Sequence, residues 1–244
     1  MFTPELLLLT LGVLVAAFLY SSVGHAGASG YIAVMSLLGL APAVIKPTAL
    51  ILNIIVASIA AMQFHRAGHF SWNLFWPFAL LAIPFAFIGG YIHLPTHLFQ
   101  IVVGIVLLFS AARFLFTLQP DEVANPPARS ISIAIGAGLG LLAGLTGTGG
   151  GIFLTPLLLL KRWARVKTSA AVSAMFILAN STAGLLGNYT STRDLPALAF
   201  PLGIAAIIGG AAGSYLGANR LPQTAIKRLL AVVLLIAGTK LILT

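Results

Sequence analysis

A long apolar run near the start of the chain is interrupted by the glycine-rich stretch Gly24-His25-Ala26-Gly27-Ala28-Ser29-Gly30. A second apolar run is interrupted in the same way by Thr146-Gly147-Thr148-Gly149-Gly150-Gly151. Glycine weakens a helix, and a helix broken inside a bilayer exposes unpaired N–H and C=O groups. Such groups are costly in hydrocarbon unless protein or a polar cavity satisfies them. Two breaks therefore predict a polar site inside a membrane protein.

The composition supports a membrane protein of the helical class. Of the 244 residues, 59% are hydrophobic and 7% are charged, whereas a soluble domain carries about 25% charged residues. Apolar segments of nearly twenty residues recur along the chain, which is typical of a polytopic helical protein. A transmembrane barrel would show short alternating segments instead. The expected segments are 5–22, 30–42, 46–64, 71–92, 97–118, 130–146, 150–161, 167–188, 196–217 and 223–243.

The net charge of +9 has two interpretations, nucleic-acid binding and membrane topology. Lys and Arg gather in short loops between apolar segments, as the positive-inside rule expects, so no nucleic-acid partner is predicted. The absence of cysteine excludes disulfides and thiolate sites. The N-terminus lacks the basic region of a cleavable signal, so the first segment is expected to remain in the fold. We expect a multi-pass protein of a cell membrane, the bacterial inner membrane, with lipid as its surroundings.

The chain divides into two similar halves. Residues 1–118 form a first membrane repeat, 119–129 a polar linker and 130–244 a second membrane repeat. Beyond the glycine stretches, Lys46-Pro47-Thr48-Ala49 resembles Lys167-Thr168-Ser169-Ala170, and Leu94-Pro95 resembles Leu221-Pro222. Several matches in the same order indicate a duplication.

Counting basic residues tests the topology. The run 5–42 is too long for one straight crossing and too short for two. If this run and 130–161 each enter the membrane and return to the same face, ten basic residues lie on one side of the membrane. Three, Lys46, Arg193 and Lys240, then lie on the other. If each run crosses once, the division is eight against five. The stronger bias favours inverted repeats, each with a broken or re-entrant first helix pair and three full spans; an eight-span parallel repeat is the alternative.

These residues resemble the sulfite exporter TauE/SafE family, also called the 4-toluene sulfonate uptake permease family. The resemblance covers nearly the whole chain: its length, its duplicated halves, the glycine motif in each half and the Lys-Thr/Ser-Ala stretch that follows. It implies a secondary carrier for sulfur-containing anions such as sulfite, sulfonates and sulfoacetate.

The residues themselves are compatible with a small anion. No carboxylate lies in the middle of a segment, which argues against a proton relay of carboxylates or a cation cage. Helices that begin at each glycine break would offer free N–H groups and the positive end of the helix dipole, without a buried lysine or arginine. Ser29, Thr146 and Thr148 add hydroxyl donors. The expected substrate-binding residues are Gly24, His25, Gly27, Ala28, Ser29, Gly30, Asn53, Thr146, Gly147, Thr148, Gly149, Gly150, Gly151 and Asn180.

Each of these candidates has a structural alternative. Gly136, Gly140 and Gly144 recur every four residues, and we assign them to helix packing. His25 could carry a coupling proton or simply donate to a neighbouring helix. Asn53 and Asn180 could line the site or join two helices by hydrogen bonds. No metal or cofactor is expected.

Three functions remain to be compared. The leading one is a secondary transporter of a small sulfur-containing anion, working by alternating access between the two repeats. A passive anion channel could use the same scaffold. An intramembrane serine hydrolase would pair Ser29 with His25, since Gly27-Ala28-Ser29-Gly30 fits a G-x-S-G pattern, but it leaves the duplication unexplained. A homo-oligomer is compatible with the sequence.

Overall fold

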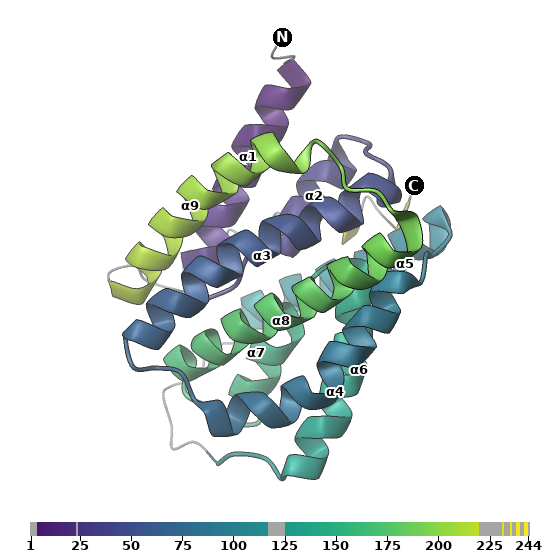
Figure 1. Ribbon diagram of the computed structural model, residues 1–244. Coiled ribbons are helices and arrows are strands. Elements are labelled where there is room, and N and C mark those ends of the chain that lie inside the picture. The colour runs from purple at the N-terminus through teal and green to yellow at the C-terminus, as the bar shows by residue number, and fades with distance from the viewer. Residues whose placement is uncertain are drawn as a thin grey trace.

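The computed structural model describes residues 4–22, 24–116, 125–219 and six single positions beyond them: 231, 235, 238, 239, 242 and 243. The segment predicted at 223–243 and residues 119–124 of the predicted linker lie outside the described residues, apart from those positions. The described ranges form helices and no strands (Figure 1). The helices are α1 (Pro4–Ser22), α2 (Ala28–Leu37), α3 (Pro42–Arg66), α4 (Trp72–Tyr91), α5 (Thr96–Phe116), α6 (Arg129–Thr146), α7 (Gly151–Leu160), α8 (Val166–Thr192) and α9 (Ala199–Asn219).

Six described helices are long and apolar enough to cross a membrane: α1, α3, α4, α6, α8 and α9. They confirm a polytopic helical membrane protein. The helices α2 and α7 have ten residues each, about 15 Å of rise, which is half of a hydrocarbon core of about 30 Å. The short helices follow the two glycine motifs, so both predicted helix breaks are confirmed.

Each short helix is capped by a glycine whose backbone conformation disfavours any other residue. Gly27 caps α2 with φ 108°, and Gly150 caps α7 with φ 80°, both in the left-handed region. After its turn, α2 runs back along α1: a β-carbon built on Gly30 would lie 2.8 Å from Ala16, and one on Gly12 would lie 2.6 Å from Val34. The first apolar run is therefore a helical hairpin.

The two halves exchange helices. The helix α6 of the second half packs along α4 of the first, and α9 packs along α1. Gly136, Gly140 and Gly144 meet the backbone carbonyls of Phe78, Ala82 and Ala86, which confirms their packing role. Gly209 and Gly213 meet the carbonyls of Leu14 and Phe18 in the same way.

The helices α3 and α8, which correspond to each other in the predicted repeats, lie side by side in opposite directions at the centre of the molecule (Figure 1). Phe64 near the end of α3 shares a cluster with Ala170 near the start of α8. Asn53 in the middle of α3 bonds Ser181, and Leu50 packs on Gly184. The α1–α9 and α4–α6 pairs lie on either side of this central pair (Figure 1).

Candidate functional site

All of the predicted binding residues are buried. The first motif forms the turn between α1 and α2 and the first turn of α2, and the second forms the turn between α6 and α7. Asn53 lies in the middle of α3 and Asn180 in α8. The structure brings part of this set together at the centre and leaves the two motifs with different neighbours.

The second motif meets the central helix pair at Gly149. A β-carbon built on Gly149 would lie 2.7 Å from Ser181 Oγ and 2.8 Å from Asn53 Nδ2. The Asn53 amide donates to Ser181 Oγ at 3.2 Å. A glycine turn, an amide of the first half and a hydroxyl of the second therefore converge, and φ of +73° keeps the turn specific for glycine.

Several buried polar atoms of α3 and α8 have no hydrogen-bond partner among the described residues. They are Asn53 Oδ1, both amide atoms of Asn180, Thr48 Oγ1 and Ser169 Oγ. A buried polar atom without a partner costs about 1–3 kcal/mol. A polar ligand that supplied partners would recover part of this energy. The pattern is typical of a binding site.

The first motif reaches across to the second half. His25 Nε2 lies 3.0 Å from Thr155 Oγ1 on α7, and the Thr155 hydroxyl donates to Ser173 Oγ on α8 at 2.7 Å. Because the Thr155 proton points to Ser173, His25 Nε2 must be the donor to Thr155. Through these two hydrogen bonds His25, the one ionisable residue of the first motif, contacts helices of the second half.

Polar side chains continue along α8. Ser169, Ser173 and Ser181 recur at multiples of four residues, so they share one side of the helix, and all three are fully buried. Asn188, further along, is 2% exposed. From Ser169 to Asn188 the helix rises about 28 Å, close to the thickness of a hydrocarbon core. Ser173 and Ser181, which the sequence did not single out, thus join Ser169 in a buried polar track through the molecule.

The hydroxyls of the second motif already have hydrogen-bond partners within the protein. Thr146 donates to the carbonyl of Leu142 at 2.7 Å, and the hydroxyls of Thr146 and Thr148 lie 2.9 Å apart. Since the Thr146 proton is used, Thr148 is the donor of that pair. In the first motif, Ser29 lies against Tyr20 of α1. The motif hydroxyls therefore hold the turns in shape in this conformation.

A buried lysine that the sequence did not predict, Lys46, lies beside the second motif and outside the central junction. Because Pro42 starts α3, before the expected boundary at 46, Lys46 falls within the helix and is 5% exposed. Its Nζ donates to the carbonyls of Gly89, Gly90 and Ile92 at 3.0, 2.9 and 2.9 Å. The ammonium thus caps the end of α4, where free carbonyls and the helix dipole favour a cation.

Comparisons with known proteins agree with this architecture. A sequence model of the family described as Sulfite exporter TauE/SafE matches residues 8–241. A protein of Sinorhizobium fredii (strain NBRC 101917 / NGR234), described as probable membrane transporter protein y4hK, is 39% identical over 239 residues, covering 96% of this chain and 97% of that protein. No solved structure matches.

Proposed function

Because the chain belongs to the sulfite exporter TauE/SafE family and is a membrane transporter, we propose that it is a secondary transporter of a small sulfur-containing anion. Sulfite, a sulfonate or a sulfoacetate-like anion would be carried by alternating access. The family sets aside the alternative of an intramembrane serine hydrolase with Ser29 and His25.

The observation that carries the proposal is the junction of Gly149, Asn53 and Ser181 at the centre of the α3–α8 pair. Asn53 Oδ1 and the amide of Asn180, the neighbour of Ser181, have no partner among the described residues, and such amide groups suit the several oxygens of a sulfur oxyanion. Of the carboxylates in the described ranges, Glu5 and Asp194 are both exposed at the ends of helices. A centre with neutral donors and no carboxylate favours an anion over a cation.

Two helix N-termini add positive potential. Neither α2 nor α7 has a side-chain cap at its N-terminus, and both begin in buried turns. Uncapped first-turn N–H groups at the positive end of a helix dipole bind anions. These ends support the predicted role of Gly27, Ala28, Gly30, Gly150 and Gly151.

We propose inverted repeats for the topology. The corresponding helices α3 and α8 pack in opposite directions, as two inverted halves require, whereas a parallel eight-span repeat would run them the same way. The glycine contacts of α1 with α9 and of α4 with α6 join helices of different halves, which bears on the parts that move during alternating access. The units that rock against each other would each contain helices of both halves, with the central pair between them.

The test is transport of labelled sulfite and methanesulfonate into proteoliposomes. Saturable uptake with counterflow supports a carrier, and unitary currents would show a channel instead. The Asn53→Leu variant should transport at least about tenfold less well, since it removes the central amide. Asn73→Leu is the matched control, because Asn73 is exposed at the start of α4. Equal transport by both variants and the parent would refute the central site.

A further inference from the structure

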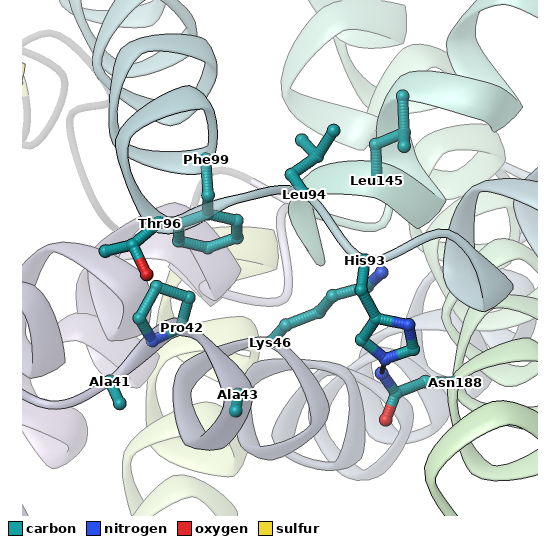
Figure 2. Close-up of a pocket in the computed structure, with 10 residues that line it drawn as sticks. All are labelled: Ala41, Pro42, Ala43, Lys46, His93, Leu94, Thr96, Phe99, Leu145 and Asn188. Carbon is teal, nitrogen blue, oxygen red and sulfur yellow. Dashed lines mark hydrogen bonds between the residues drawn. The ribbon is translucent and has the colours of Figure 1, made fainter.

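A cavity of about 210 Å³ lies at the end of the molecule where α3 begins and α4 ends. Figure 2 shows its walls, to which Pro42, Lys46, His93, Thr96, Leu145 and Asn188 contribute. The volume is more than ten times the roughly 15 Å³ that one water needs. A small solute with part of its hydration shell fits such a space.

The walls of the cavity carry positive charge. Among the described residues that line it, the Lys46 ammonium is the one charged group and none is a carboxylate. All three Lys46 N–H groups donate to neutral carbonyls, so its charge is not compensated by an ion pair within the described residues. The first residues of α3 and of α5, Pro42 and Thr96, also face the cavity and bring two positive helix ends to it. The potential therefore favours an anion.

Polar groups are available for direct contact. Asn188 is 2% exposed, its Oδ1 has no partner, and its Nδ2 lies 3.4 Å from His93 Nε2 (Figure 2). Ser191 lies 3.2 Å from His93 Nδ1. If the amide turns over, Asn188 Oδ1 accepts from His93 and its NH₂ group is free for a ligand. The Thr96 hydroxyl lies at the exposed rim.

The cavity adjoins the second glycine motif. A β-carbon built on Gly147 would lie 3.2 Å from the Lys46 carbonyl oxygen and 3.4 Å from its Cγ, and Leu145 of α6 forms part of the wall. The buried polar track of α8, with Ser181 near the central junction, ends at Asn188 in the cavity. The cavity thus lies at one end of the track that passes the central site.

We propose that this cavity is a second anion site, at which a small sulfur oxyanion waits between the central site and the membrane face at which α3 begins. That the anion in this cavity is the transported substrate rests on the proposed function. A lipid phosphate would offer the same oxyanion chemistry from another source, so the test must separate the two.

The test uses the absence of cysteine from the chain. The Thr96→Cys variant is labelled in lipid-free detergent by a maleimide, with and without methanesulfonate; sulfite is unsuitable because it adds to maleimides. At ten times the Kd of methanesulfonate, labelling should slow about tenfold. A Thr192→Cys variant is the control, because Thr192 is exposed at the end of α8 and does not line the cavity.

Lys46→Met, added to Thr96→Cys, should raise the half-protecting concentration about tenfold or more. Lys167→Met is matched to it, since Lys167 is the corresponding lysine of the second half and is exposed, and it should have no effect. If Lys46→Met does not fold, Asn188→Ala gives the same comparison without removing the cap of α4. Protection that survives in the folded cavity variants would overturn the proposal.

Two further results separate the explanations. Protection by short-chain phosphatidylglycerol but not by methanesulfonate would assign the cavity to a lipid headgroup and overturn the waiting site. Uptake of labelled methanesulfonate by parent proteoliposomes is measured in parallel. Uptake without protection at Thr96→Cys refutes the cavity site alone, whereas protection without any uptake of sulfite or sulfonate refutes the proposed function.

Discussion

Replacement of Gly149 by alanine separates the two reasons for which the second motif needs glycine. Gly149 has φ of +73°, a conformation that costs an L residue about 1–2 kcal/mol. Its new β-carbon would also lie 2.7 Å from Ser181 Oγ and 2.8 Å from Asn53 Nδ2. Those atoms must move by several tenths of an ångström, and such overpacking costs about 1–3 kcal/mol more.

Gly68→Ala isolates the backbone term. Gly68 has nearly the same φ, +75°, but a β-carbon there meets nothing within 4 Å. The two variants should therefore share the conformational cost and differ by the crowding alone, about 1–3 kcal/mol. In the thermal unfolding of a chain of this size, that difference corresponds to about 2–12 °C.

The same pair of variants is then compared in proteoliposome uptake. Gly68→Ala should keep the parent KM, because the turn after α3 is remote from the polar junction. Gly149→Ala should raise the KM for sulfite about tenfold, since it displaces the Asn53 amide and the Ser181 hydroxyl. Equal melting temperatures and equal uptake for the two variants would refute the idea that the motif closes a packed polar junction.

Three further variants test other parts of the structure. Gly140→Ala should lower the stability by about 1–3 kcal/mol in thermal unfolding, because its β-carbon meets the α4 backbone, whereas Gly138→Ala on the same helix meets nothing and should be neutral or slightly stabilising; equal effects would contradict the α4–α6 contact. His25→Gln keeps a donor but cannot take up a proton, so uptake should persist with a flatter pH profile; an unchanged profile would exclude this histidine from proton coupling. Lys46→Met should lower the melting temperature, because three carbonyls lose their donor, while Lys167→Met should leave it unchanged; similar shifts would show that the cap contributes nothing.

The helix breaks could be predicted because their cause is local. Clustered glycines weaken a helix wherever they occur, and a membrane gives the freed backbone groups few alternatives. The packing role of Gly136, Gly140 and Gly144 was likewise visible in their spacing. The helix α3 begins four residues before the predicted boundary at 46, because Pro42 is a favourable first residue of a helix, whereas the run before Lys46 reads as one apolar stretch.

The buried polar groups could not be predicted because their partners are distant in sequence. Lys46 resembles an interfacial lysine until the end of α4 is folded against it, and its acceptors lie at Gly89, Gly90 and Ile92. A serine inside a span is equally ambiguous. Ser58 merely donates to a carbonyl of its own helix at 2.7 Å, whereas Ser181 accepts from Asn53 of the other half. Only the fold distinguishes these two uses of one residue type.

The arrangement of the halves bears on how transport proceeds in each direction. Two inverted repeats with identical side chains would give the anion the same path from either face. With the repeats predicted here, this chain would depart from that symmetry: Lys46 is buried beside the cavity, but its predicted counterpart Lys167 is exposed, and His25 has no histidine at the matching position. Such differences can give the two faces different KM values. They cannot set the net direction, because a binding site alone supplies no free energy. Export or uptake must follow from the anion gradient, the membrane potential or a coupled proton, so Lys46→Met should change the KM measured from one face and leave the equilibrium distribution of the anion unchanged.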